Sequence, residues 1–240
     1  MVSFVVTGAS RGLGLEYVKQ LSARGDTVFA CARNPDQSQA LTQIVDNQKV
    51  FAVKLDVTCE KSIKEAVDEI SKHSPEGIDV LVNNAGVSGT EDDIEKVSKD
   101  ELHQLFETNV IAVNEVTKGF LPLLRKRGNE QVKKIVNISS ILGSIKTAGS
   151  PDLVSFNAIA SYRVSKSALN MVTKLQSIHL AKENFIVYSI HPGWCQTDMG
   201  GEKAPITTEQ SIRGQLAKID SITVSENGGF FDWSGDVIEY

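Results

Sequence analysis

The sequence predicts an α/β fold in which helices cover both faces of a doubly wound parallel sheet, within a single domain formed by residues 1–240. Two observations carry this prediction. Short apolar runs rich in β-branched residues alternate with segments of helical periodicity, which is the pattern of strands that pair in parallel. A glycine-rich turn, Gly8–Gly14, separates the first such run from the first helical segment. A chain of 240 residues also has the length of one domain of this class.

The predicted strands are short and apolar, so we expect them to be buried on both faces of the sheet. The first reads VSFVVT, and each later strand follows a helical segment. The expected strands are Val2–Thr7, Thr27–Ala32, Lys49–Leu55, Ile78–Val82, Gln131–Ser139, Phe185–His191 and Gly228–Trp233.

Apolar residues at helical spacing predict the segments between these strands. They are a helix after Gly14, one through Leu41, Ile44 and Val45, one at Lys61–His73, a pair of helices within Lys99–Arg127, a long helix at Tyr162–Lys182 and a short one at Ser211–Lys218. The second helix of the pair has to tolerate Pro122. Residues 200–210 contain glycine, proline and threonine, and we expect them to form a mobile lid.

Composition argues against several classes of function. A net charge of −5 and a pI near 5.5 disfavour nucleic-acid binding, which requires a basic field. No apolar run approaches the roughly 18 residues of a membrane span, and Met1–Phe4 lacks the basic start of a secretory signal. The three cysteines are widely spaced and the four histidines lack ligand spacing. We therefore expect a cytoplasmic protein with reduced thiols and no metal site.

The glycine turn is the first candidate site. Between a strand and a helix, glycines let the backbone approach a pyrophosphate, and the helix N-terminus offers N–H groups and a positive dipole. The order Gly8-x3-Gly12-x-Gly14 differs from the general G-x-G-x-x-G dinucleotide pattern. Its position favours nucleotide binding in a Rossmann-type fold over the alternative of an ordinary glycine-rich loop.

The second candidate site is the segment Tyr162-Arg163-Val164-Ser165-Lys166. Residues four apart lie on one face of a helix, so the Tyr162 phenol and the Lys166 ammonium can point into the same space. A nearby ammonium favours the phenolate and is expected to lower the pKa of Tyr162. Ser140, at the end of the preceding strand, is placed to hold a carbonyl oxygen. If the spacing of Tyr162 and Lys166 were the only evidence, the ordinary interpretation would be a pair of side chains on the surface of a helix.

Five motifs in order resemble the short-chain dehydrogenase/reductase family over essentially the whole chain. They are TGxxxGxG at Thr7–Gly14, NNAG at Asn83–Gly86, Ser140, YxxxK at Tyr162–Lys166 and the pair Pro192-Gly193. The segment after Ser140, His191–Gly201 and the ending Gly228–Phe231 are similar to the carbonyl-reductase branch that includes the sniffer and C-factor types.

The resemblance implies a catalytic set of Asn109, Ser140, Tyr162 and Lys166, in which the Asn109 backbone holds a water linked to Lys166. The alternative for Asn109 is a residue that caps or bends its helix. The resemblance also implies cofactor contacts at Gly8, Ser10, Arg11, Gly12, Leu13, Gly14, Arg33, Asp56, Val57, Asn83, Ala85, Gly86, Tyr162, Lys166, Pro192, Gly193 and Thr197. Many relatives form homodimers through the helices that match those of Asn109 and Tyr162.

Charge at the end of the second strand predicts the cofactor. An acid there would hydrogen-bond the adenosine ribose and repel a 2′-phosphate, but this strand ends in Ala32-Arg33. Arg33, together with Arg11 in the glycine turn, is suited to a 2′-phosphate because a guanidinium offers paired donors. We therefore expect NADPH. The alternative is that both are ordinary surface arginines.

The connection at residues 141–161 is longer than in much of the family. We expect Ser150–Asn157 to form one wall of the substrate pocket, with Trp194 and Met199 as further wall candidates; the alternative is a solvent loop. The resulting prediction is an NADPH-dependent reductase of aldehydes or ketones. Two rivals are an NADP(H)-binding regulatory protein with little turnover and a sugar-nucleotide epimerase, whose larger C-terminal substrate domain has no counterpart after Gly193.

Overall fold

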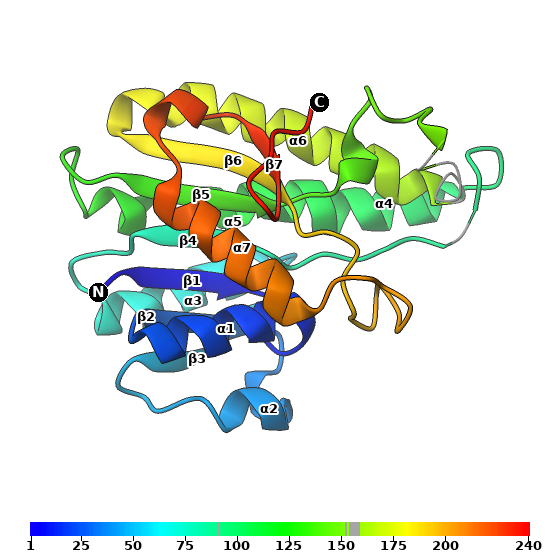
Figure 1. The fold of residues 1–240 in the computed structure, drawn as a ribbon. Helices are drawn as coiled ribbons and strands as arrows, with labels where there is room; N and C mark the ends of the chain where they lie inside the picture. The colour runs from blue at the N-terminus through cyan, green and yellow to red at the C-terminus, as the bar shows by residue number, and fades with distance from the viewer. Residues whose placement is uncertain (91, 152, 154–158) are drawn as a thin grey trace.

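The computed structural model describes residues 1–90, 92–151, 153 and 159–240. Its centre is a seven-stranded sheet in the order β3-β2-β1-β4-β5-β6-β7, and adjacent strands pair in parallel throughout. The strands are β1 (Ser3–Thr7), β2 (Thr27–Ala32), β3 (Val50–Lys54), β4 (Val80–Asn83), β5 (Lys133–Ile138), β6 (Phe185–His191) and β7 (Phe230–Asp232), as Figure 1 shows. The predicted doubly wound parallel sheet is confirmed.

Helices cover both faces of this sheet. They are α1 (Gly12–Arg24), α2 (Gln39–Thr42), α3 (Glu60–His73), α4 (Lys99–Phe106), α5 (Ala112–Arg125), α6 (Ala160–Leu180) and α7 (Thr208–Ser221). Helices α1 and α7 pack together on one face, while α3 and α5 pack on the other. In Figure 1, α7 (orange) crosses in front of the strands and α5 lies behind them.

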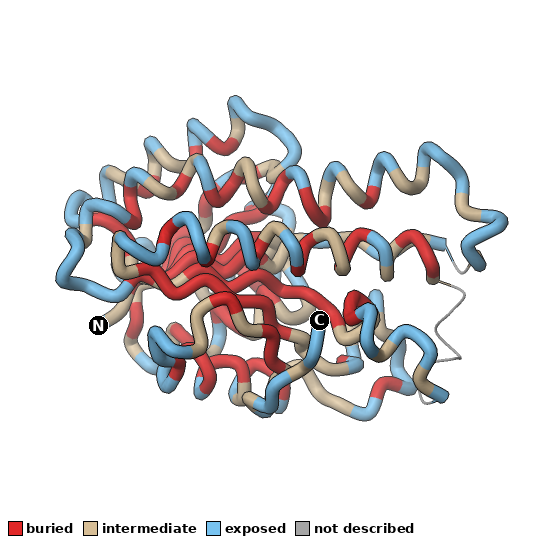
Figure 2. The backbone as a smooth tube through the Cα atoms, turned by 90° about the horizontal axis from the view of Figure 1, so that it is seen from above, coloured by how far each residue is buried: buried red, intermediate tan, exposed pale blue. Residues whose placement is uncertain are grey.

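The core forms on both sides of the sheet because successive side chains of a strand point in opposite directions. In β1, Phe4 and Val6 pack with the α1 and α7 side chains, whereas Val5 packs with those of α3 and α5. All five residues of β1 are buried, as expected for a strand of this kind. The central strands form the buried middle layer of Figure 2.

Two helices differ in length from the prediction. Helix α2 covers only Gln39–Thr42, and Ile44 and Val45 lie after its end, from where they still pack against the core. Helix α7 starts earlier than predicted because Thr207 and Gln210 form a capping box at its N-terminus. Residues 208–210, predicted to be part of a mobile lid, therefore belong to this helix.

The predicted pair of helices within Lys99–Arg127 is one continuous helical run. A π-helical turn, Glu107–Ile111, joins α4 to α5 without a break, and Asn109 lies inside this turn. A π-turn carries one extra residue per turn and is often found at functional sites. Pro122 is accommodated inside α5, as predicted.

The strand order reverses at β1, which lies between β2 and β4. In open parallel sheets, ligands bind beyond the carboxyl ends of the strands at such a switch point. The glycine turn, Ser140 and Pro192-Gly193 lie just after the ends of β1, β5 and β6, and the NNAG segment begins with the last residue of β4. The fold therefore brings the main predicted motifs to one edge of the sheet.

Candidate active site

The glycine turn after β1 is shaped for close backbone approach. Gly8 and Gly12 have φ angles of +67° and +54°, which side chains disfavour. A Cβ on Gly14 would overlap the carbonyl oxygen of Gly8, so this position has to stay without a side chain. Arg11 precedes α1 without capping it, which leaves the first N–H groups of α1 without a side-chain partner. This arrangement fits a pyrophosphate at a helix N-terminus.

The NNAG segment after β4 is fastened to the glycine turn. The Thr7 hydroxyl accepts hydrogen bonds from the backbone N–H groups of Asn84 (2.9 Å) and Ala85 (3.0 Å), and the Asn84 amide donates to Thr7 O at 2.8 Å. The Asn83 side chain points into the core, where it donates to Thr117 and Asn137. Asn83 is therefore available to a cofactor only through its backbone, and the linking role of Asn84 was not predicted.

Ser140 and Tyr162 meet at the end of β5. Ser140 follows this strand, is buried and accepts a hydrogen bond from the N–H of Leu142 at 3.2 Å. Tyr162 lies in the first turn of α6, partly exposed, and its phenol is hydrogen-bonded to the Ser140 hydroxyl. The two hydroxyl groups predicted to act on one carbonyl oxygen are thus neighbours.

Lys166 completes this group. Its ammonium is buried, lies 5.5 Å from the centre of the Tyr162 ring and donates to the carbonyl oxygen of Ile138 at 2.8 Å. Burial lowers the pKa of Lys166 to about 8. The predicted face-sharing of Tyr162 and Lys166 on one helix is confirmed by this contact.

The expected lowering of the Tyr162 pKa is not produced by the chain alone. Burial raises the pKa of Tyr162 to about 12, and the hydrogen bond with Ser140 only partly opposes it. Lys166 lies against the ring and donates to Ile138 rather than to the phenol oxygen. Desolvation of the phenolate therefore dominates in the chain alone. The expected lowering, which relies on the nicotinamide charge of the cofactor as well as on Lys166, stays a prediction.

Asn109 bridges two segments through its side chain. Its amide oxygen accepts from the N–H of Val87 (2.9 Å), and its amide nitrogen donates to Val87 O (2.9 Å) and to the Ser165 hydroxyl (3.0 Å). A Cβ on Gly86 would lie 3.2 Å from the Asn109 oxygen and 3.7 Å from the Lys166 nitrogen. Asn109 thus ties Val87, the residue directly after the NNAG segment, to α6. A residue that only caps or bends its own helix would not make these contacts.

The segment after β6 folds over the glycine turn. Gly193 has a φ angle of +84°, and Thr197 lies 3.4 Å from the position of a Cβ on Gly12. The segment is held by hydrogen bonds from Gln196 N to Ile206 O (2.9 Å) and from Ile206 N to Trp194 O (3.2 Å). Of the predicted contacts in this segment, Thr197 therefore lies next to the glycine turn.

Charged residues at this edge are placed as follows. Arg11 forms an ion pair with Asp198 at 2.9 Å, with both side chains 77% exposed. Arg33 is exposed directly after β2. Asp56 accepts from the N–H (3.1 Å) and hydroxyl (2.8 Å) of Thr58. Val57 lines a small hollow together with Thr7, Asn83 and Ala85, which brings the predicted adenine contact next to the NNAG segment.

Part of the predicted pocket wall lies outside the described residues, because Asp152 and residues 154–158 are not among them. The beginning of the 141–161 connection is held by the end of the chain: Ser144 donates to Glu239 O at 2.6 Å and Lys146 N donates to Tyr240 O at 3.2 Å. Trp194 and Met199 are 44% and 53% exposed. Their roles as pocket walls remain predictions.

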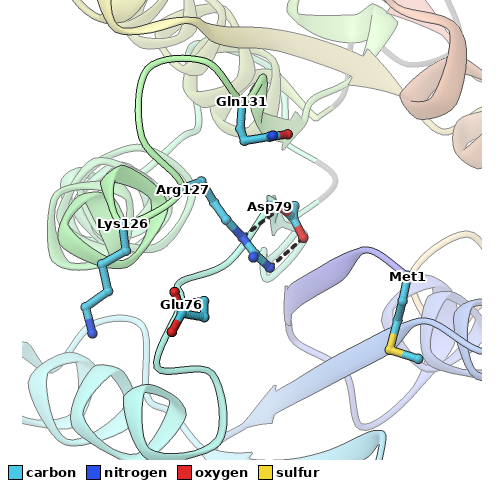
Figure 3. A pocket seen from close by; sticks show the side chains of 6 residues that line it. All are labelled: Met1, Glu76, Asp79, Lys126, Arg127 and Gln131. Atoms are coloured by element: carbon cyan, nitrogen blue, oxygen red, sulfur yellow. Dashed lines mark hydrogen bonds and ion pairs between the residues drawn. The ribbon is translucent and has the colours of Figure 1, made fainter.

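A cavity of about 340 Å³ lies at the opposite end of the sheet. Figure 3 shows its lining side chains, Met1, Glu76, Asp79, Lys126, Arg127 and Gln131. Inside it, Arg127 pairs with Asp79 at 2.8 Å. The cavity lies at the amino ends of the strands, whereas parallel sheets bind ligands at the carboxyl ends. We therefore do not assign the active site to it.

Across residues 1–90, 92–151, 153 and 159–240, no group of histidine, cysteine and acidic side chains is arranged to hold a metal ion. Cys31, Cys59 and Cys195 are free thiols. In the same described part of the chain, no helix has the length and apolar character needed to cross a bilayer.

A glycine turn at the switch point of a parallel sheet, with Ser140, Tyr162 and Lys166 at the same edge, is the arrangement of a nucleotide-dependent oxidoreductase. A model of the short chain dehydrogenase family matches residues 3–206, and the chain belongs to this family. It is similar to the NADPH-bound carbonyl reductase from chicken fatty liver (32% identity, TM-score 0.91, covering 99% of this chain and 98% of that one).

The chain is also similar to two other proteins. The carbonyl reductase Sniffer of D. melanogaster is 33% identical, with a TM-score of 0.91 and complete coverage of both chains. The C-signal protein of Myxococcus xanthus is 36% identical over 163 residues, which is 68% of this chain and 93% of that protein.

Proposed function

We propose that this protein is an NADPH-dependent carbonyl reductase that converts an aldehyde or a ketone to an alcohol. The observation that carries the proposal is the contact between the Ser140 and Tyr162 hydroxyls, with Lys166 beside the ring, at the edge of the sheet that holds the glycine turn. The similarity to an NADPH-bound carbonyl reductase and to Sniffer supports the same activity.

The residues of the chain fit the cofactor. The uncapped start of α1 and the glycine turn suit the pyrophosphate, while Arg33 and Arg11 suit the 2′-phosphate. Gly86 brings backbone close to Lys166, and Thr197 reaches the glycine turn from the other side. Bound NADPH supplies the hydride to the carbonyl carbon.

The chain's own residues provide the proton. Ser140 donates a hydrogen bond to the carbonyl oxygen and stabilises the negative charge that develops there. Tyr162 gives its proton to that oxygen, so the product is a neutral alcohol. The phenolate left behind is stabilised by Ser140 and by the Lys166 ammonium. Because burial raises the pKa of Tyr162 to about 12, the phenol is fully protonated at neutral pH and ready to act as an acid.

A second candidate is an NADP(H)-binding regulatory protein with little turnover. The similarity to the C-signal protein favours it. The two candidates share cofactor binding and differ in catalysis. The grouping of Ser140, Tyr162 and Lys166 favours the enzyme, because a protein that only binds the cofactor does not need a protonated phenol at this edge.

The test is NADPH consumption in the presence of a panel of quinones, aldehydes and diketones. We expect carbonyl-dependent oxidation of NADPH by the wild-type protein and its loss in the Ser140→Ala variant. Tight NADPH binding with no oxidation by any member of the panel would favour the regulatory candidate.

A further inference from the structure

Glu101 joins three segments around the start of the catalytic helix. Its carboxylate accepts a hydrogen bond from the hydroxyl of Ser161, the residue directly before Tyr162. The same carboxylate accepts from the backbone N–H of Thr90 (3.0 Å) and from the Thr90 hydroxyl (2.7 Å). Helix α4, the segment after β4 and the first turn of α6 therefore meet at one side chain.

Helix α6 lacks a cap of its own. Its N-cap residue, Ile159, makes no side-chain hydrogen bond, and its first turn contains no acidic residue. The N–H of Ala160 instead donates to Asp92 O at 3.2 Å. A carboxylate near a helix N-terminus is favourable because the dipole is positive there. Glu101, on α4, thus provides the carboxylate that the first turn of α6 lacks.

The Glu101–Ser161 contact resembles the Asn109–Ser165 contact. Ser161 and Ser165 lie one helical turn apart on α6, and both are completely buried. Each is bonded to a side chain of the α4–π-turn run, and each of those side chains also holds the backbone of the segment after β4. Tyr162 and Lys166 directly follow the two serines in sequence. Two bridges therefore fix how α6 is rotated about its axis.

Close packing leaves this bridge little freedom. A Cβ on Gly89 would overlap both the Ser161 hydroxyl and the Glu101 carboxylate, so the backbone of the segment after β4 lies directly against the pair. The hydrogen bonds from Ser161 and Thr90 lower the pKa of Glu101, which keeps it ionised at neutral pH.

We propose that Glu101 is a positioning residue for Tyr162, acting through the Ser161 hydroxyl. The inference rests on the proposed function, in which Tyr162 delivers a proton to the substrate. A displacement of about 1 Å in a catalytic group can cost about 100-fold in rate, so a contact on the adjacent residue matters for turnover.

The test compares Glu101→Gln with Glu101→Leu, which are similar in size. Glutamine keeps an oxygen for Ser161 and Thr90 N, and its amide can donate to the Thr90 hydroxyl, whose own proton then goes to Asp92 at 2.7 Å. Leucine removes every one of these bonds. Ser161→Ala deletes a single oxygen and disturbs folding least. Ser177→Ala is the matched control, because Ser177 is a buried serine of α6 whose hydroxyl donates to Lys174 O within the same helix turn.

We expect Glu101→Leu and Ser161→Ala to lower kcat about 10- to 100-fold, with NADPH affinity within about twofold of the wild type. We expect Glu101→Gln and Ser177→Ala to keep kcat within about threefold. Wild-type turnover in Glu101→Leu and Ser161→Ala would overturn the proposal, as would an equal loss in Glu101→Gln.

Hydrogen exchange separates this inference from the proposed function. The backbone amides of residues 161–166 should exchange faster in Glu101→Leu and at the wild-type rate in Glu101→Gln. Faster exchange in a protein that reduces no carbonyl would support the bridge and contradict the reductase. Unchanged exchange in Glu101→Leu would contradict the bridge whatever the activity.

Discussion

Burial sets the proton affinities of the two groups at the centre of the site. It raises the pKa of Tyr162 to about 12 and lowers the pKa of Lys166 to about 8, because both charged forms lose hydration. Both shifts favour the uncharged forms. The phenol of Tyr162 therefore holds its proton at neutral pH. When it gives this proton to the substrate, Ser140 and Lys166 have to stabilise the phenolate that remains.

Replacement of Tyr162 tests the proton donor. Tyr162→Phe removes one oxygen and leaves the ring, so NADPH binding should stay within about twofold while kcat falls by roughly 100- to 10,000-fold. Single-turnover kinetics and a fluorescence titration with NADPH measure the two quantities separately. Activity close to that of the wild type would show that another group supplies the proton.

The pKa of Lys166 predicts how stability depends on pH. The folded-state value of about 8 lies below the ordinary value of 10.5, so the unfolded chain binds more protons between these two pH values. The free energy of unfolding should therefore rise with pH across this window, by up to about 3 kcal/mol from this group. Urea unfolding at several pH values measures it. Lys166→Met should lose this rise, and Lys174→Met, at an exposed position of the same helix, should keep it.

At the scale of elements, the glycine turn and the segments that cover it act as one unit. Thr7 bonds the NNAG segment, and Thr197 contacts the turn from the β6 side. The start of α1 approaches the Gly8 carbonyl so closely that only glycine fits at position 14. The shape of the turn therefore depends on packing between β1 and α1.

A methyl group at position 14 tests this packing. In Gly14→Ala the Cβ would overlap backbone, which cannot move aside as a flexible side chain can. We expect a loss of about 1–3 kcal/mol in the free energy of unfolding and much weaker NADPH binding. Gly149→Ala is the matched control, because a Cβ there meets nothing within 4 Å. Equal NADPH affinity of the two variants would contradict the role of the turn.

The strands and the main site residues were predictable from the sequence because the signals are local. The apolar run before Gly8 and the four-residue spacing of Tyr162 and Lys166 can be read within a few positions. The π-turn around Asn109 was not predictable, since one extra residue in a turn hardly changes apolar periodicity.

Contacts between distant segments also escaped prediction. Glu101 and Ser161 are 60 residues apart, and nothing in either local sequence indicates that they meet. The sequence also shows that Lys166 is near Tyr162, but it does not show the burial that raises the pKa of the phenol in the chain alone.

At the scale of the whole molecule, one surface remains apolar. Helix α6 exposes Met171, Leu175 and Ile178 at 61%, 59% and 63%. The homodimer expected through the helices of Asn109 and Tyr162 is still a prediction, and it would bury this stripe. We expect sedimentation of the wild type to show a dimer and that of Leu175→Asp to show a monomer, because a charge in an apolar contact is costly. A wild-type monomer at all concentrations would contradict this prediction.

Cofactor preference should appear in the stability of the whole protein. A ligand that binds only the folded state at about 100 times its Kd adds about 2.7 kcal/mol, which raises the Tm of a chain of this size by roughly 5–10 °C. NADPH should give this shift at concentrations where NADH gives little, because Arg33 and Arg11 can pair with a 2′-phosphate and the end of β2 has no acid to repel it. Combining Ala32→Asp with Arg33→Ser should reverse the order, since the carboxylate would bind the ribose and repel the phosphate. Equal shifts with both cofactors in the wild type would show that these arginines do not select the phosphate.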